Sequence, residues 1–264
     1  MKINFKHQCI FPLLLGLTSF SVFSRAYPSL QLGIYGSNIT YTEPDVMQEE
    51  GELFGLMGRF IYTDQYVSRT LEATYASGDM DYDGSGTIKD IPDEIFEIRG
   101  LVSRDLAYIN DYKVSPYVGL GYRYLNDDSS GLVSSTGASG YEREQSYLYM
   151  PIGVEFQKRT PINGWLLSTK LEYDYFIAGE NTTHLSDVDG NDDIELTQDE
   201  GYGHRISISF SKDFRNGMIL SIEPFYKYWH IADSDIVYDS TRGKYWVEPD
   251  NNSEEFGIAF LFRL

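Results

Sequence analysis

Ten segments of the chain alternate apolar with polar residues over similar lengths, and this repeated pattern is the strongest restriction on the fold. In one of them, Leu148, Met150 and Ile152 share a face, as alternate residues of a β-strand do. Each segment is long enough to cross a bilayer obliquely, which takes about 9 to 11 residues. The ten predicted strands are residues 29–41, 53–63, 66–78, 94–104, 112–125, 146–158, 165–178, 202–213, 218–230 and 254–264.

The connections between these segments alternate in length. The long ones are residues 43–52, 79–93, 126–145, 179–201 and 231–253, and the short ones are 64–65, 105–111, 159–164 and 214–217. Transmembrane β-barrels have long outer loops and short periplasmic turns, so the alternation fits an up-and-down barrel. An even number of strands places both ends of the barrel in the periplasm.

Charged residues within the predicted strands fall almost entirely on the face opposite the apolar residues. Six cations and six anions share this face, which we expect to form the lumen: Arg59, Arg99, Arg123, Lys170, Arg205, Lys227, Glu72, Glu97, Glu155, Glu172, Asp174 and Glu223. Equal numbers allow full pairing, and an unpaired buried charge is strongly unfavourable. The sequence therefore predicts a closed, salt-bridged lumen.

A soluble β-sandwich would show the same alternation, with its apolar face inside. Aromatic residues near the strand ends favour the membrane, because barrels carry aromatic girdles at both interfaces. These residues are Tyr62, Tyr122, Tyr124, Trp165, Tyr175, Tyr226 and Tyr228.

The first 26 residues have the features of a signal peptide. Lys2 and Lys6 precede an apolar run at 10–23, and Ser24 and Ala26 are the small residues that a signal peptidase recognises. The run is too short for a membrane-spanning helix. We predict residues 1–26 as a signal peptide and residues 27–264 as one barrel domain, which contains no cysteine.

The end of the chain combines a polar residue, a glycine and spaced aromatics in Glu255, Gly257, Phe260 and Phe262. This terminal strand resembles that of bacterial outer-membrane β-barrel proteins, although Leu264 stands where the family usually ends in phenylalanine. The resemblance implies that the barrel insertion machinery recognises Glu255, Gly257, Phe260, Phe262 and Leu264 as an assembly signal.

A second resemblance lies at residues 115–122, with the sequence SPYVGLGY. It looks like the proline-tyrosine, glycine-rich strand of the OmpA-like or opacity-type outer-membrane β-barrel domain. This resemblance implies the barrel fold and no particular activity. Gly119 and Gly121 would make room in the lumen for large neighbours such as Arg123.

The chain is strongly acidic, with a net charge of −19. Nucleic acid is therefore excluded as a partner. The long connections carry most of the negative charge, so divalent cations are possible partners there and could bridge the loops to lipopolysaccharide phosphates. Residues 81–88 resemble the start of an EF-hand loop, but Pro92 stands where the bidentate glutamate belongs. Turn chemistry in solvated acidic loops is the preferred interpretation of this segment over a specific calcium site, and we predict no metal site and no cofactor.

Three histidines follow the predicted signal peptide: His184, His204 and His230. All lie toward the outer side, where a surface hydrolase would need a base. His204 and His230, however, share the parity of the lipid-facing residues, which favours histidines on the rim of the barrel. We therefore predict no catalytic residues and leave open whether the chain is an enzyme.

These patterns predict an all-β protein, a ten-stranded up-and-down antiparallel transmembrane barrel with long acidic outer loops and short periplasmic turns. We expect a monomer in the outer membrane of a Gram-negative bacterium, surrounded by outer-membrane lipid and lipopolysaccharide. Its expected role is structural or surface interaction. The alternatives are a surface hydrolase, of protease or lipid A-modifying type, and a narrow, porin-like passive pore.

Overall fold

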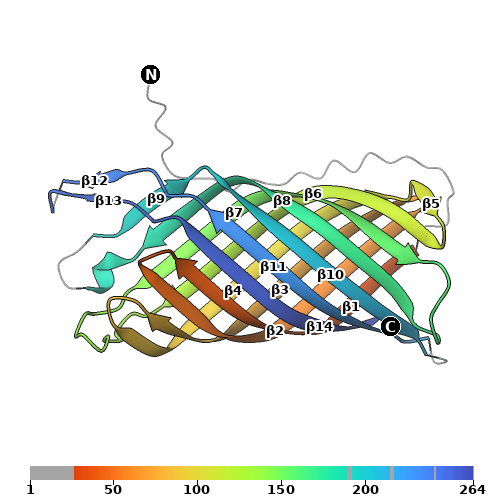
Figure 1. The fold of residues 1–264 in the computed structure, drawn as a ribbon, viewed down its shortest axis with the longest axis horizontal. Helices are drawn as coiled ribbons and strands as arrows, with labels where there is room; N and C mark the ends of the chain where they lie inside the picture. The colour runs from red at the N-terminus through yellow and green to blue at the C-terminus, as the bar shows by residue number, and fades with distance from the viewer. Residues whose placement is uncertain (1–26, 189–191, 215–216, 241, 264) are drawn as a thin grey trace, which may run out of the picture.

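The computed structural model describes residues 27–188, 192–214, 217–240 and 242–263 (Figure 1). The predicted signal peptide and Leu264 lie outside the described residues. Within these ranges, no helix is long and apolar enough to cross a membrane.

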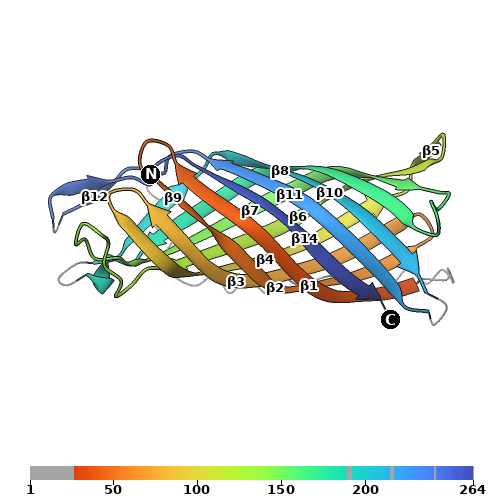
Figure 2. The same ribbon diagram turned by 60° about the horizontal axis from the view of Figure 1, so that its bottom comes forward.

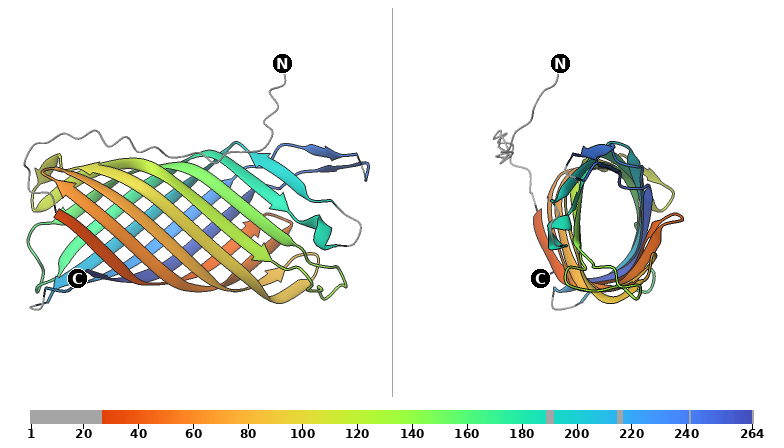
Figure 3. Two further views of the ribbon diagram at one scale, coloured as in Figure 1. Left: turned by 180° about the vertical axis from the view of Figure 1, so that it is seen from behind. Right: turned by 90° about the vertical axis from the view of Figure 1, so that its left-hand side faces the viewer.

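Ten long antiparallel strands close into a barrel, which confirms the predicted fold. The sheet runs in chain order around the ring; β14 pairs with β1 to close one seam, and β10 pairs with both β8 and β11 (Figure 2). Seen end-on, the strands form a closed ring of elliptical outline (Figure 3). The strands are β1 (Tyr27–Glu43), β2 (Met47–Asp64), β3 (Val67–Asp83), β4 (Thr87–Arg104), β6 (Tyr112–Asp128), β7 (Glu142–Lys158), β8 (Leu166–Thr183), β10 (Gly201–Asp213), β11 (Ile219–Ile231) and β14 (Asn251–Arg263).

Short elements extend the barrel at its two ends. At one end, β5 (Ala107–Ile109) pairs with the start of β6. At the other end, β9 (Ile194–Gln198) pairs with β8, and the hairpin of β12 (Val237–Asp239) and β13 (Lys244–Trp246) projects beyond the barrel (Figure 1). We call these the short-turn end and the long-loop end.

The outer wall carries an apolar band around the half of the barrel nearer the short-turn end. On β2, Phe54 and Leu56 are largely exposed, and on β14 Phe256 and Ile258 point outward in the same way. Exposed apolar side chains in a continuous belt would be unstable in water but suit a hydrocarbon surrounding. The band therefore marks the part of the barrel that fits a bilayer.

Past this band the strands continue toward the long-loop end with polar outer faces. On β2, the outward positions beyond Phe54 are Glu52, Glu50 and Gln48, all exposed. The segments 43–52 and 79–93, predicted as loops, are therefore mostly strand, with tight turns at Glu43–Met47 and Asp83–Thr87. The prediction of these two loops was wrong because strands that stand in water on their outside lose the apolar alternation.

The short-turn end contains compact turns. Between Phe214 and Met218, which are joined by a backbone hydrogen bond of 2.9 Å, Gly217 takes a φ of +84°. Only glycine adopts this left-handed conformation freely, and a three-residue hairpin loop requires it.

Candidate functional site

The half of the lumen inside the apolar band is filled by a buried ionic network. Arg59 on β2 binds Glu72 on β3 at 2.5 Å and Glu223 on β11 at 3.0 Å. Arg99 on β4 binds the same Glu72 and also Glu172 on β8, each at 2.6 Å. Each arginine thus ties together strands from different parts of the wall, which fixes the interior as well as filling it.

Two further cations extend this network. Arg205 on β10 reaches Glu97 at 2.6 Å and Glu172 at 3.0 Å. Lys227 on β11 lies 3.4 Å from Glu97 and 3.2 Å from Glu255 on β14. Arg205 also lies 3.9 Å from Asp174. We refer to these residues with Arg59, Arg99, Glu72 and Glu223 as the ionic core.

Glu255 was assigned from the sequence only to the assembly signal, yet it is almost completely buried in the ionic core. It binds Lys227 and accepts a hydrogen bond from the hydroxyl of Tyr35. The alternation along the strand could have identified Glu255 as a lumen residue, because it shares its face with Ala259 and Leu261, which are both buried in the lumen.

Three of the twelve predicted lumen charges make no ion pair among the described residues: Arg123, Glu155 and Lys170. Glu155 and Lys170 are cross-strand neighbours on β7 and β8, but both are half-buried near the short-turn end, where water can solvate them. The full pairing that equal numbers of cations and anions would allow is therefore not reached among the described residues.

Arg123 is the more unusual exception, because it is only 1% exposed. None of its three guanidinium nitrogens has a hydrogen-bond partner among the described residues. Its cross-strand neighbour Glu97 is already bound by Arg205 and Lys227. The Arg123 guanidinium instead lies 5.8 Å from the ring centroid of Trp229, within reach of a cation–π interaction.

An aromatic layer lies above the ionic core on the side of the long-loop end. Tyr149 and Trp229 meet edge to face at 5.0 Å, and Tyr147 and Phe176 pack beside them. The Tyr149 ring lies against Gly121, where an added Cβ would come within 2.2 Å of it. Gly121 therefore makes room for Tyr149, and not for Arg123 as the sequence suggested.

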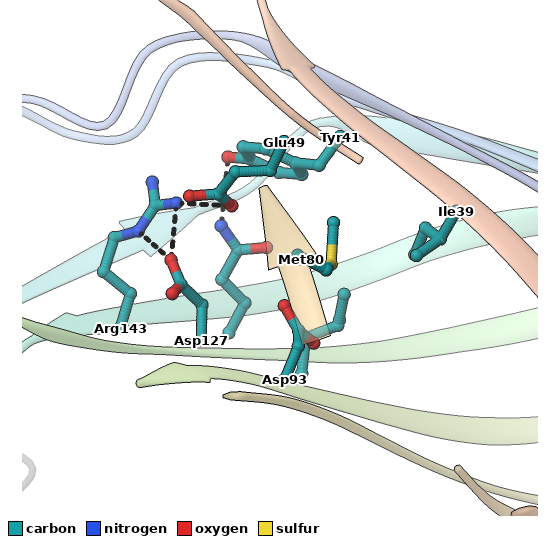
Figure 4. A pocket seen from close by; sticks show the side chains of 9 residues that line it. Ile39, Tyr41, Glu49, Met80, Asp93, Asp127 and Arg143 are labelled. Carbon is teal, nitrogen blue, oxygen red and sulfur yellow. Dashed lines mark hydrogen bonds and ion pairs between the residues drawn. The ribbon is translucent and has the colours of Figure 1, made fainter. Parts of the chain in front are cut away.

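Beyond the aromatic layer, inside the part of the barrel that extends past the apolar band, lies a small acidic chamber. We define the outer chamber by Tyr41, Glu43, Glu49, Asp93, Asp127, Arg143, Gln145 and Glu248, several of which line a cavity of about 30 Å³ (Figure 4). Such a volume holds a water molecule or two. Its residues lie in or next to segments predicted as loops, so the chamber was not predicted from the sequence.

The predicted assembly signal is divided between the two faces of β14. Phe260 and Phe262 point outward, beside Ile34 and Leu32 of β1 and Ile222 and Leu220 of β11. Gly257 points inward, where an added Cβ would lie 2.4 Å from both the Phe225 ring and the carbonyl oxygen of Gly36. Packing in the folded barrel therefore requires glycine at position 257, because a larger side chain would collide with these atoms.

The segment that resembled an EF-hand loop is a β-hairpin at the tip of β3 and β4. The carboxylate of Asp81 binds Lys89 at 3.0 Å and accepts a hydrogen bond from the backbone N–H of Asp90. Among the described residues, no group of acidic or histidine side chains is arranged to hold a metal ion.

The histidines lie in two different places. His204 and His230 are on the outer wall, packed against Tyr202 and Tyr228 in a ring cluster beyond the apolar band. His184 lies near the long-loop end, with Nδ1 3.3 Å from Asp193 and Nε2 3.5 Å from Glu144. Burial lowers the pKa of His184, but its two carboxylate partners outweigh burial and raise that pKa above the ordinary value. The structure does not bring the three histidines together.

Solved structures with a similar fold are bacterial outer-membrane barrels. The outer membrane protease OmpT from Escherichia coli aligns with a TM-score of 0.59 at 10% identity, covering 93% of this chain and 98% of that chain. A major outer membrane protein from Thermus thermophilus reaches a TM-score of 0.37 at 12% identity, over 89% of this chain and 99% of that one. Neisserial surface protein A reaches 0.32 at 9% identity, over 90% of this chain and 98% of that one.

The two lower scores carry no argument, and an identity of 10% shows a common fold alone. No protein-family model matches the sequence, and no curated protein matches it significantly. The resemblance to OmpA-like and opacity-type domains therefore stays a sequence-based prediction. The chain has the fold of a ten-stranded outer-membrane β-barrel.

Proposed function

We propose that the chain is an integral outer-membrane protein with a closed lumen and a structural or surface-interaction role. The observation that supports this most strongly is the ionic core, in which Arg59, Arg99 and Arg205 join opposite parts of the wall. The cavity among these side chains measures about 20 Å³, which is room for water but not for a continuous file of hydrated ions.

The long-loop end would face outward, and contacts with other molecules would be made there. An open groove between the β1–β2 and β3–β4 turns is lined by Glu43, Asp45, Glu50, Asp81 and Asp83. We include lipopolysaccharide, and divalent cations bridging its phosphates to this acidic surface, among the proposed partners. Because no metal site is formed among the described residues, binding would be weak; calorimetry that detects no heat with millimolar Ca²⁺ would remove the cation from this proposal.

The proposed orientation makes a labelling prediction. The only cysteine, Cys9, lies in the predicted signal peptide, so single cysteines can be introduced elsewhere. Ser85→Cys lies in the exposed β3–β4 turn, and Tyr66→Cys lies in the β2–β3 turn at the opposite end. In intact cells a membrane-impermeant maleimide should label Ser85→Cys and not Tyr66→Cys, whereas both should react after permeabilisation.

The unsubstituted protein is the control for background labelling. Labelling of Tyr66→Cys alone in intact cells would reverse the orientation. Equal labelling of both variants without permeabilisation would contradict a membrane location.

The hydrolase and pore alternatives gain no specific support. His204 and His230 face away from the lumen, and His184 has carboxylates at both ring nitrogens, which favours its charged form over a free base. The neighbour named as a protease contributes its fold only. A peptidase and lipase screen of the refolded protein is the direct check on the hydrolase alternative.

A further inference from the structure

Side chains of the outer chamber connect opposite sides of the barrel at its long-loop end, which we call the mouth. Arg143 on β7 reaches Glu49 on β2 at 3.1 Å and Asp127 on β6 at 2.9 Å (Figure 4). It also reaches Glu43 on β1 at 3.0 Å. Strands β1 and β2 lie about half-way around the ring from β7, so the pairs with Glu43 and Glu49 cross the lumen, whereas Asp127 is the direct cross-strand neighbour of Arg143.

A second connection runs beside the first. Gln145, also on β7, donates a hydrogen bond to the Tyr41 hydroxyl of β1 at 3.1 Å. That hydroxyl donates to Glu248, which precedes β14, at 3.3 Å. Together the two connections form a strap across the mouth, and side chains of β7 hold both of them.

The charges of the strap do not balance. Arg143 is the one cation among the defined chamber residues, against five carboxyl groups: Glu43, Glu49, Asp93, Asp127 and Glu248. All five are largely buried, so water screens their mutual repulsion poorly. A chamber with all five ionised would carry a large uncompensated negative charge.

Asp93 is the carboxyl group most affected by this excess of acidic groups. It is 6% exposed and lines the cavity with Glu49 and Asp127, yet its carboxyl group makes no hydrogen bond or ion pair within the described part of the chain. Isolated buried carboxylates are strongly disfavoured, so such a group keeps its proton. Asp93 is therefore an unpaired acid directed into a water-sized space.

We propose that the outer chamber is a proton-operated strap, which holds β7 to β1 and β2 across the mouth while the carboxyl groups in excess of Arg143, those of Glu49, Asp93 and Glu248, keep their protons, and which loosens when these groups ionise. This inference concerns how opening of the mouth is regulated. It rests on the proposed function in one respect, the side of the membrane that the mouth faces.

The acid–base properties of the chamber support this direction. Burial raises the pKa of Glu49 to about 8, against the opposing effect of Arg143, and burial likewise raises the pKa of Glu248 to about 7. Burial, with Asp127 and Glu49 nearby, raises the pKa of Asp93 well above its ordinary value. These groups lie beyond the apolar band, in the part of the barrel surrounded by water.

Every element around Glu49 contributes to its environment. The titratable and charged groups that face the chamber or lie next to it are Tyr41 and Glu43 from β1, Tyr82 from β3, Asp93 from β4, Asp127 and Arg123 from β6, Tyr141 before β7, Arg143 and Tyr147 from β7, and Glu248 before β14. Arg143 and Arg123 are the two cations in this set, and Arg123 lies below the chamber beside Trp229. Acids thus outnumber cations on all sides of the mouth.

The sign of the pH effect follows from proton binding. A carboxyl group with a raised pKa in the folded state binds its proton more tightly there than in the unfolded chain, so the folded state loses relative stability as pH rises. For Glu49 the loss begins near its ordinary pKa of 4.5 and is complete above about 8. Closed and stable at acidic pH, the mouth should loosen at alkaline pH.

Spin labels can measure the opening directly in the refolded full-length protein. Labels at Gln48→Cys on β2 and Ser146→Cys on β7 lie on the outer wall at opposite sides of the mouth. With Cys9 replaced by serine, double electron–electron resonance should give a narrow distance distribution at a pH of about 5.5 and a longer, broader one at about 8.5, which lie on either side of the raised pKa values of Glu248 and Glu49. The melting temperature should fall over the same pH range.

Variants separate the strap from the rest of the barrel. Glu49→Gln and Asp93→Asn should abolish most of the pH-dependent change in distance and reduce the fall in melting temperature. Glu50→Gln is the matched control, because Glu50 is adjacent on β2 but exposed on the outer wall. It should respond to pH as the unsubstituted protein does.

Distances that stay the same between the acidic and the alkaline condition would overturn the proposal, as would an unchanged pH response in Glu49→Gln and Asp93→Asn. Closure by Ca²⁺ at the constant alkaline pH would also overturn it and make the chamber a cation site. None of these outcomes depends on the orientation of the barrel in cells, so failure here is distinguishable from failure of the proposed function.

Discussion

The double variant Phe260→Asp/Phe262→Asp should fail to assemble and should leave unfolded protein in the periplasm. Both side chains point to the outer wall of β14 at the seam with β1, where they meet Ile34 and Leu32. A charge on the lipid face costs up to about 2–4 kcal/mol at the bilayer midplane for lysine or arginine, and less for aspartate. Two such charges also remove the aromatic residues of the predicted assembly signal.

The measurement is the heat-modifiable mobility of the protein in outer-membrane fractions. A matched control is Tyr238→Asp/Tyr245→Asp, which makes the same kind of change in the exposed β12–β13 hairpin. This control should assemble normally. Normal heat-modifiable mobility of the Phe260/Phe262 variant would show that neither the lipid face of β14 nor the aromatic signal is needed for assembly.

Removal of Arg99 should lower the free energy of unfolding by a few kcal/mol, because it removes two buried ion pairs of the ionic core. Arg99 is 5% exposed and binds Glu72 and Glu172 at 2.6 Å each. Breaking a buried pair costs about 3–5 kcal/mol, because the remaining charge is left uncompensated. Arg59 still binds Glu72, and Arg205 still binds Glu172, so we expect Arg99→Ala to fold with a reduced free energy of unfolding.

Denaturant titration of the refolded protein measures this loss. Lys89→Ala is the control, since Lys89 forms an ion pair with Asp81 at a similar distance but is 76% exposed. Exposed pairs contribute about 0–1 kcal/mol, so this control should be near neutral. Equal effects of Arg99→Ala and Lys89→Ala would mean that the ionic core does not stabilise the barrel.

Alternation along the strands predicted the number of strands and the inward direction of their charges, and the terminal strand with the aromatic residues near the strand ends favoured a membrane barrel over a soluble sandwich. The alternation worked inside the apolar band because lipid on one side and a polar lumen on the other impose opposite residues on the two faces. Toward the long-loop end, water replaces lipid. There Glu50 and Glu52 face outward while Glu49 faces inward, and the alternation that identifies a strand disappears.

The pairing within the lumen was only partly predictable. Parity places Arg99 and Glu172 on the inner wall, but their contact joins residues far apart in the chain and depends on the diameter and tilt of the barrel. For the same reason, nothing in the sequence distinguishes Arg123, which packs near Trp229, from Arg205, which binds two glutamates. The outer chamber could not be predicted at all, since its carboxyl groups converge only when the strands extend past the band.

Ion conductance in planar bilayers tests the central claim most directly, namely that interior side chains close the lumen. The account predicts no steady conductance above that of the bare bilayer, both for the unsubstituted protein and for Arg99→Ala, because loss of one side chain from an interlocked core does not open a continuous path. Steady, ion-selective conductance that changes on substitution of Arg123 or Glu172 would contradict it and favour the pore.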